Sequence, residues 1–176
     1  MDCYRYLKEL RSFFLISMYN FDRVYSVIFK RRNIVKALIQ SFSFKRTGYP
    51  VDKTGKGGGF VFDCRAIDAY DYSLGYGPNT PFEHMHLTGL DPEISVALDK
   101  DEGTQAFYQA VCTLVLLDIY KCIRRGFNVM TVNFGCTAGQ HRSVYMAEKL
   151  ARDIGLTFDE LSVELVHLEK DHWPKK

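Results

Sequence analysis

The pattern of hydrophobic and polar residues predicts four β-strands along the chain, two from partial alternation and two from short β-prone runs. Residues 34–44 and 161–168 alternate in this way, and short β-branched or aromatic runs occur at 59–65 and 129–134. Alternation with a period of two is the pattern of a strand that buries one face, and turn-forming residues bound each run. The sequence therefore predicts a β-sheet built from segments that lie far apart in the chain.

Two longer segments between these strands have a helical spacing of apolar residues. They cover 104–125 and 143–153, and we expect Gly126 and Gly155 to end them. Strands that are separated by helices favour an α/β fold, here a three-layer domain with a mainly parallel central sheet and flanking helices. Ligands of such sheets bind at the carboxyl ends of the strands, where Asp63–Arg65, Gly135–Cys136 and His167 fall.

The remaining segments set the expected domain organisation. Residues 1–33 are rich in aromatic residues and predict an amphipathic helical extension, which packs either on the domain or on a second subunit of a homo-oligomer. Residues 34–176 form the domain itself. Within it, residues 66–92 predict a long irregular loop, and loops of this length in a compact domain are usually functional.

Composition and charge narrow the class of protein. The chain has 176 residues, of which 47% are hydrophobic and 25% charged, as in an ordinary globular domain. The net charge of +2 is too small to demand a polyanionic partner. The cations nevertheless occur in clusters, which form either solvated faces or a surface for a phosphate-rich ligand or RNA. These clusters are Lys30–Arg32, Lys45–Arg46, Lys121 with Arg124–Arg125, and Lys175–Lys176.

Cysteine and histidine usage gives no indication of a metal or a cofactor. The five cysteines include no CxxC pair, and we interpret most of them as small buried residues of a protein in the reducing cytoplasm. His84 and His86 lack a third ligand at a suitable spacing, so we expect no metal site. We expect no membrane span either, because the apolar runs fall short of roughly 20 residues.

The most informative segment reads Thr131-Val-Asn-Phe-Gly-Cys-Thr-Ala-Gly-Gln-His-Arg-Ser-Val-Tyr145. A predicted strand runs into a loop of small residues, Gly135–Gly139, and a helix follows. Backbone N–H groups and the helix dipole would both direct positive charge at this loop. Arg142 could add a bidentate contact to the same anion. The segment therefore predicts a phosphate-binding loop.

The same loop contains the Cys136-(x)5-Arg142 spacing of cysteine-dependent phosphatases. That chemistry needs a thiolate, an arginine that binds the phosphoryl group, and a general acid such as Asp68, Asp71 or Asp91. Gly135 stands where these enzymes usually have histidine. A loop that binds phosphate without reacting with it accounts for the same residues, and it is the interpretation we favour.

Three other features leave alternatives open. The segment Thr54–Gly59 does not match a nucleotide P-loop, and we interpret it as a flexible turn. Asp91 either caps a helix that begins at Pro92 or belongs, with Thr88 and Gly89, to a ligand site. His141 either donates to a phosphate or bonds a carbonyl group.

Several of these segments together resemble one family, the C-terminal domain of the bacterial RapZ-type RNase adapters. The similarity covers about residues 34–170 and rests on four motifs in the same order. They read Ser41-Phe-Ser-Phe-Lys45, Val61-Phe-Asp-Cys-Arg65, Leu87-Thr-Gly-Leu-Asp-Pro92 and Gly135-Cys-Thr-Ala-Gly-Gln-His-Arg-Ser-Val144.

The resemblance implies a binding domain rather than an enzyme. In that family the domain senses an amino-sugar phosphate, glucosamine-6-phosphate, and binds small regulatory RNAs that it presents to an endoribonuclease. The matching positions imply a ligand pocket made of Cys136, Thr137, Gly139, Gln140, His141, Arg142, Ser143, Asp63, Arg65, Thr88, Gly89 and Asp91. They also imply RNA contacts at Lys45, Lys170, Lys175 and Lys176.

The sequence departs from the family pattern in three places. Ala138 replaces a glycine of the loop, residues 66–72 replace an L-P-N-P segment, and the tail 167–176 is less basic than expected of an RNA-binding arm. The N-terminal nucleotide-binding domain of full-length members has no counterpart in this chain. We therefore do not extend nucleotide binding or any cofactor to it.

Overall fold

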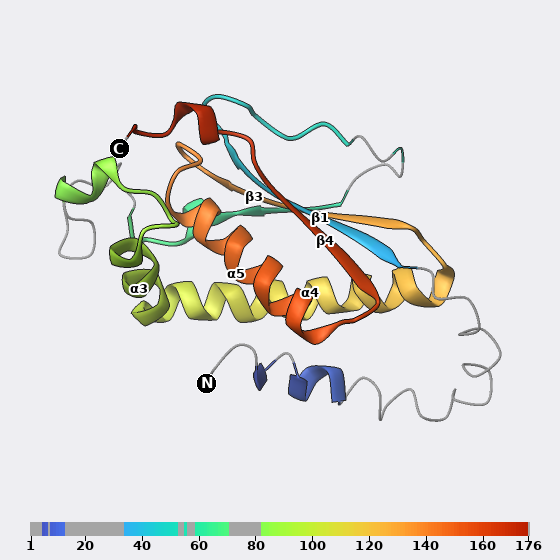
Figure 1. The fold of residues 1–176 in the computed structure, drawn as a ribbon. Helices are drawn as coiled ribbons and strands as arrows, with labels where there is room; N and C mark the ends of the chain where they lie inside the picture. The colour runs from blue at the N-terminus through green and yellow to red at the C-terminus, as the bar shows by residue number, and fades with distance from the viewer. Residues whose placement is uncertain are drawn as a thin grey trace.

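The computed structural model describes residues 5–6, 8–12, 34–52, 55, 59–70 and 82–175 (Figure 1). Four parallel strands form its sheet in the order β2-β3-β1-β4. The strands are β1 (Val35–Ser43), β2 (Phe60–Asp63), β3 (Val129–Cys136) and β4 (Leu161–His167). The helices are α3 (Pro92–Lys100), α4 (Glu102–Arg125) and α5 (Arg142–Thr157), with short 3-10 turns η2 (Cys64–Ala66), η4 (Phe82–His86) and η5 (Lys170–His172). The predicted α/β fold with a parallel sheet and flanking helices is confirmed.

The two faces of the sheet have different environments, which explains the alternating pattern of the strands. In β1, Val35, Ala37 and Ile39 are fully buried, whereas Lys36 between them is exposed and contacts Glu164 of β4. The strand register places Ile39 level with Val132 of β3, so the buried residues of neighbouring strands lie on one face. This face is the hydrophobic one that the alternation predicted.

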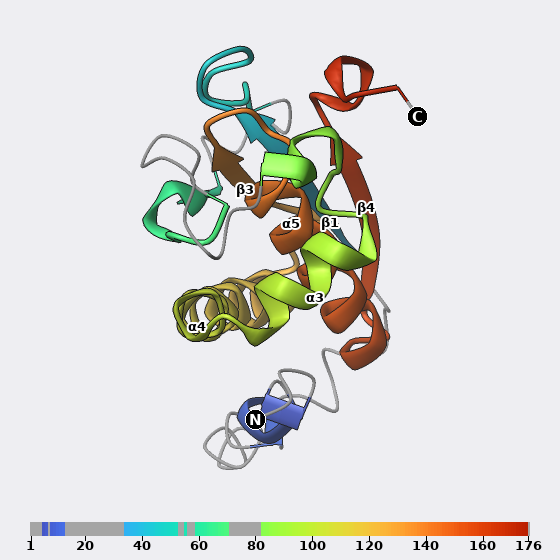
Figure 2. The ribbon, with the colours of Figure 1, turned by 90° about the vertical axis from the view of Figure 1, so that its left-hand side faces the viewer.

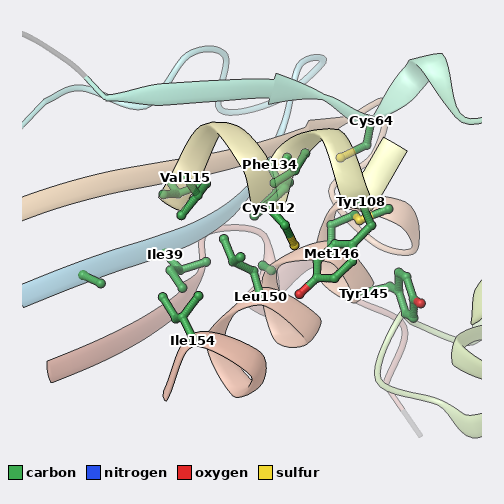
Figure 3. Close-up of a cluster of buried hydrophobic side chains, with 14 of the residues drawn as sticks. Ile39, Cys64, Tyr108, Cys112, Val115, Phe134, Tyr145, Met146, Leu150 and Ile154 are labelled. Atoms are coloured by element: carbon green, nitrogen blue, oxygen red, sulfur yellow. The ribbon is translucent and has the colours of Figure 1, made fainter. Parts of the chain in front are cut away.

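Helices cover the buried face of the sheet. Within the described residues, α3, α4 and α5 all lie on that side, as Figures 1 and 2 show from two directions. Apolar side chains from α4 and α5 meet those of the strands in one core (Figure 3). Figure 3 labels Val115 and Cys112 of α4, Leu150 and Ile154 of α5, and Ile39 of β1 in this core. The opposite face of the sheet meets the segment after β1, where Pro50 and Val51 help to line a cavity of about 90 Å³.

Helix α4 corrects one expectation from the sequence. It is long and apolar enough, by length and composition alone, to cross a membrane, so the statement that no segment reaches this limit was wrong. Tyr108, Val115 and Ile119 of the helix are nevertheless fully buried under the sheet. Hydrophobicity is what a core helix requires, and here it is used for packing within the domain.

Helix boundaries were partly predicted. Asp101 caps α4 by accepting hydrogen bonds from the backbone and hydroxyl of Thr104, and Gly126 ends the helix in the left-handed conformation, as expected. The prediction that Gly155 ends the next helix was wrong, because α5 continues to Thr157 and Phe158 caps it. Helix α3 begins at Pro92 after Asp91, as one of the two interpretations held, although the Asp91 side chain forms no capping hydrogen bond.

Part of the N-terminal segment packs on the domain. The described residues there are helical, and the Tyr6 hydroxyl lies 3.1 Å from the Thr113 hydroxyl of α4. Arg11 donates to the carbonyl of Thr157 and lies over the ring of Phe158 at 4.9 Å. These residues therefore contact the same chain, whereas the rest of 1–33 lies outside the described residues. The division into 1–33 and 34–176 stays a prediction.

Candidate functional site

Parallel pairing brings the carboxyl ends of the strands to one edge of the sheet. Ser43 of β1 pairs with Cys136 of β3, and Asp63 of β2 pairs with Gly135. Figure 2 faces this edge, where the loop after β3, the turn after β1 and the C-terminal segment lie near one another. We name the residues Cys136–His141 the anion loop, because they run from the last residue of β3 to the residue before α5.

Close packing fixes the first part of the anion loop. A Cβ atom at Gly135 would lie 2.5 Å from Cε2 of Phe44 and closer still to the ring of Phe42. Both rings therefore need a glycine beneath them, which explains why this position lacks the histidine of cysteine phosphatases. Next to it, Cys136 is 3% exposed and its Sγ lies 3.1 Å from Oγ of Ser143, which is itself fully buried.

The carbonyl groups of the anion loop are used by the surrounding chain. The Cys136 carbonyl accepts from the Phe44 backbone at 3.0 Å, and the Thr137 carbonyl accepts from the Ser43 hydroxyl at 2.7 Å. Further along, the Gly139 carbonyl accepts from the Trp173 indole at 3.0 Å, and the Gln140 carbonyl accepts from the backbone of Gly89 at 2.8 Å. The negative ends of these peptide dipoles are therefore neutralised.

The N–H groups of the anion loop differ from its carbonyl groups in their hydrogen bonding. Among the described residues, the backbone N–H groups of Ala138, Gly139 and Gln140 donate no hydrogen bond. They directly precede the N-terminus of α5, where the helix dipole adds partial positive charge. Successive N–H donors at such a position form an anion-binding concavity. The order of strand, loop and helix is the one that the local sequence predicted, whereas an anion site at this loop stays a prediction.

Gln140 and His141 hold the anion loop against residues 84–89. The Gln140 amide donates to the carbonyl groups of Met85 at 2.8 Å and Leu87 at 2.7 Å. Nε2 of His141 lies 3.3 Å from the carbonyl oxygen of His84, and the His141 ring stacks on Tyr70 with centroids 5.7 Å apart. Burial lowers the pKa of His141 to about 4, so this imidazole is neutral near pH 7.

Thr88, Gly89 and Asp91 support the anion loop from behind. Oδ2 of Asp91 accepts hydrogen bonds from the Thr88 backbone at 2.7 Å and from its hydroxyl at 3.0 Å. Gly89 packs on the start of α5, where a Cβ atom would lie 2.6 Å from the backbone nitrogen of Tyr145. The structure therefore brings these three residues to the site, where they form hydrogen bonds and packing contacts within the chain.

Asp63, Arg65 and Arg142 form the side of the site that follows β2. Asp63 accepts from Arg65 at 2.9 Å from Nε and 2.6 Å from Nη2, and this hydrogen bonding lowers the pKa of the carboxyl group. Arg142 is 3% exposed, and its Nη1 donates to the carbonyl of Ile67 at 2.6 Å. Its guanidinium thus places a buried positive charge between the anion loop and residues 63–67.

Three residues around the anion loop were missed by the sequence analysis. The Ser43 hydroxyl bonds the loop, Trp173 donates to it, and Glu169 is only 1% exposed, with its Cγ 2.5 Å from where a Cβ at Gly139 would lie. They come from β1 and from the C-terminal segment. No local pattern marks them, because their roles depend on contacts across at least thirty positions of the chain.

The residues predicted for RNA are only partly placed. Lys45, Lys170 and Lys175 are exposed, and the backbone nitrogen of Lys45 lies 3.4 Å from the Thr137 carbonyl oxygen. Lys176 lies outside the described residues, as does most of Thr54–Gly59. Of the candidate general acids, Asp68 is exposed, Asp91 is bonded to Thr88, and Asp71 is not among the described residues. Among the residues that the structure describes, no group of three His, Cys, Asp or Glu side chains could hold a metal ion.

Comparison with known proteins identifies the family. The model of the RapZ C-terminal domain matches residues 35–171. A nucleotide-binding protein of Thioalkalivibrio sulfidiphilus is 37% identical over 118 residues, which are 65% of this chain and 35% of that protein. A nucleotide-binding protein of Lactobacillus delbrueckii is 35% identical over 142 residues, which are 78% of this chain and 41% of that protein. One of Lactobacillus helveticus is 32% identical over 150 residues, which are 84% of this chain and 45% of that protein. The chain thus spans well under two thirds of the length of these relatives. The resemblance drawn from the four motifs is confirmed: the chain belongs to the RapZ C-terminal domain family.

Proposed function

We propose that this domain is a non-enzymatic sensor that binds a phosphorylated small molecule at the anion loop. The observation that carries the proposal is the pairing pattern of the loop. The carbonyl groups of Cys136, Thr137, Gly139 and Gln140 accept hydrogen bonds from the surrounding chain. The N–H groups of Ala138, Gly139 and Gln140, in contrast, donate no hydrogen bond among the described residues. Such an arrangement favours an anion and disfavours a cation. Arg142 follows the loop as the first residue of α5 and is buried, and we expect its charge to favour an anion at the same site.

The ligand class that we propose is an amino-sugar phosphate such as glucosamine-6-phosphate. Membership of the RapZ C-terminal domain family supports this choice. The phosphate would lie on the loop amides, and the hydroxyl of Thr137, which is half-buried, could reach a neighbouring sugar hydroxyl. Asp63 is the acidic side chain at this edge that is half-exposed and could meet an amino group. Cys136, Ser143 and His141 would shape the pocket rather than react.

We extend the proposal to an adapter role in the cytoplasm. Lys45, Lys170, Lys175 and Lys176 would contact a small regulatory RNA, and an RNase would act on the RNA that the domain presents. Three of these four lysines are exposed in the described part of the chain, on segments that contact the anion loop. The relatives carry the name nucleotide-binding protein, but they extend well beyond this domain. Nucleotides are therefore comparison ligands in the tests below.

Removing the buried guanidinium should abolish the response to the ligand. For wild-type protein, a sugar phosphate at about 100 times its Kd should stabilise the fold by about 2.7 kcal/mol, which corresponds to roughly 5–10 °C in Tm. Arg142→Met keeps a side chain of similar length in the buried position and removes the charge, so its Tm should not respond. The measurement is thermal unfolding with glucosamine-6-phosphate, glucose-6-phosphate and ATP.

Arg152→Met is the matched control for this experiment. Arg152 lies on the same helix, but its side chain is 62% exposed and it pairs with Asp153. Its Tm should rise with ligand as in the wild type. A ligand-induced shift that persists in Arg142→Met would refute the phosphate site. If the wild type responds to ATP alone, the sugar phosphate is refuted as the ligand, while the anion loop remains the proposed binding site.

The alternative is a cysteine-dependent phosphatase that uses Cys136 and Arg142. Against it, Cys136 is buried against Ser143, and Gly135 leaves no room for the histidine of that signature. We expect no release of phosphate from an aryl phosphate above background. Cys136→Ser decides the matter, because release by the wild type that the substitution removes would establish thiolate catalysis.

A further inference from the structure

An exposed aromatic ring stands beside the anion loop, on the turn that follows β1. Tyr49 is 70% exposed, although tyrosine is on average an intermediately buried residue. Its ring contacts Phe44 edge to face with centroids 5.4 Å apart. Phe44 in turn contacts Phe42, and both rings cover Gly135. Tyr49 is thus the exposed end of a cluster of three aromatic rings, and the other two rings, Phe42 and Phe44, pack on Gly135.

Cationic side chains occur on the same turn and over the neighbouring Phe44 ring. The Arg65 guanidinium lies over the Phe44 ring, 4.0 Å from its centroid, and its side chain is 47% exposed. Lys45 and Arg46 precede Tyr49 on the same turn and are exposed. Two carboxylates face them: Asp63 pairs with Arg65, and the buried Glu169 lies 3.8 Å from Arg46. The accessible part of the surface is therefore aromatic and carries three exposed cations against one exposed carboxylate, Asp63, since Glu169 is only 1% exposed.

Hydrogen bonds hold the turn in one conformation. Oγ of Ser43 accepts from the backbone nitrogens of Lys45 at 3.2 Å and Arg46 at 3.1 Å, and donates to the Thr137 carbonyl of the anion loop at 2.7 Å. The backbone N–H of Gly48 donates a hydrogen bond to the Ser43 carbonyl at 2.9 Å. Tyr49 is therefore presented by a braced turn, and little conformational entropy remains to be lost when a ligand stacks on it.

We propose that Tyr49, with Arg65 and the Phe44 ring behind it, is a stacking site for an unpaired base of single-stranded RNA. Aromatic rings bind bases through their faces, and flanking cations contact the phosphates on either side. Exposed Lys45 and Arg46 stand where such phosphates would lie. A purely apolar partner would leave these cations unused, so the charge pattern favours RNA over a protein. The proposal rests on the RNA half of the proposed function and names the chemistry of that contact.

The test measures binding of a fluorescent single-stranded oligouridylate of about ten nucleotides, within the usual range of site sizes. Fluorescence anisotropy at several salt concentrations gives both affinity and salt slope. Tyr49→Ala should weaken binding about 5- to 100-fold and leave the slope of log K against log salt unchanged, because it removes stacking and no charge. Tyr49→Phe should bind as the wild type does. Lys45→Gln should reduce the slope by about 0.7, the contribution of one phosphate contact on a single strand.

Each other outcome counts against the proposal. If Tyr49→Ala binds the oligonucleotide like the wild type, the stacking site is refuted while RNA binding stands, and Tyr49 with exposed Val51 becomes a surface for a protein partner. If the wild type does not bind the oligonucleotide, the stacking site and the RNA half of the proposed function both fail. The sugar-phosphate response is measured separately and is unaffected by either result. Thermal unfolding of each variant confirms that it is folded.

Discussion

Replacing Gly135 with histidine is expected to destabilise the protein by about 3 kcal/mol. The new side chain would have to enter the space that the rings of Phe42 and Phe44 occupy, since even its Cβ would lie 2.5 Å from the Phe44 ring. Phe42 is fully buried and lies on β1, which pairs with β3 at this position, so neither ring nor strand can move aside easily. Overpacking of a well-ordered site typically costs one to a few kcal/mol, and this position lies at the upper end of that range.

Urea unfolding measures this effect, and Gly155→Ala provides a matched control. Gly155 lies inside α5, and a Cβ there would meet only Cγ2 of Val163, at an ordinary 3.7 Å. Alanine should therefore stabilise the helix by about 0.5–1 kcal/mol. The two glycines separate crowding from the general effect of removing glycine. Full stability of Gly135→His would show that the rings can yield, and it would reopen the phosphatase interpretation of the loop.

The consequence of this crowding concerns function. A cysteine phosphatase places a histidine before its nucleophile, and this loop uses the same position to pack two phenylalanine rings. The rings support the turn that carries Tyr49 and, through Arg65, the end of β2. Packing at Gly135 therefore serves to join the anion loop to its neighbours. That arrangement suits recognition of a ligand and its partners better than attack by Cys136.

The sequence predicted those parts of the fold that depend on local patterns. All four strands were found to within a few residues. Alternation marks β1 and β4, whereas β-branched and aromatic runs mark β2 and β3, and β3 is buried along nearly its whole length. The end of α5 was placed too early, since Gly155 was taken as a stop signal, whereas a partly exposed helix tolerates one glycine at a cost of about 1 kcal/mol. The strand order β2-β3-β1-β4 was not predicted, because pairing between distant strands leaves no local signal.

The candidate site shows the same division. The strand, loop and helix around Cys136 could be predicted because they are contiguous, and the structure confirms this order of elements. Roles of individual side chains could not be predicted. The Thr88 hydroxyl donates a hydrogen bond to Asp91, and the Gln140 amide donates to the carbonyl groups of Met85 and Leu87. These polar residues, which suggested ligand contacts, therefore also brace the loop. Ser43 and Trp173 were overlooked because they reach the loop from distant segments of the chain.

Buried His141 should make the stability of the domain depend on pH below neutrality. It is 8% exposed, and burial is the main cause that lowers its pKa from 6.5 to about 4 in the folded state, with the nearby Arg142 and His84 acting in the same direction. In the unfolded chain this imidazole titrates near 6.5. Between these two values the unfolded state binds the proton and the folded state does not. Stability is therefore complete above about pH 6.5 and falls as the pH drops toward 4.

The expected loss at this one residue is about 3 kcal/mol between pH 7 and pH 4. Carboxyl groups also titrate in this range, so the informative quantity is the difference between wild type and His141→Gln, measured by urea unfolding at each pH. Glutamine keeps a neutral donor near the His84 carbonyl and removes the titration. The variant should lose less stability on acidification, by about 3 kcal/mol. His86→Gln, at an exposed position, separates loss of a buried imidazole from loss of any imidazole. Parallel curves for wild type and His141→Gln would mean that His141 takes up its proton within the folded domain, which would then have to open between residues 84–89 and the anion loop.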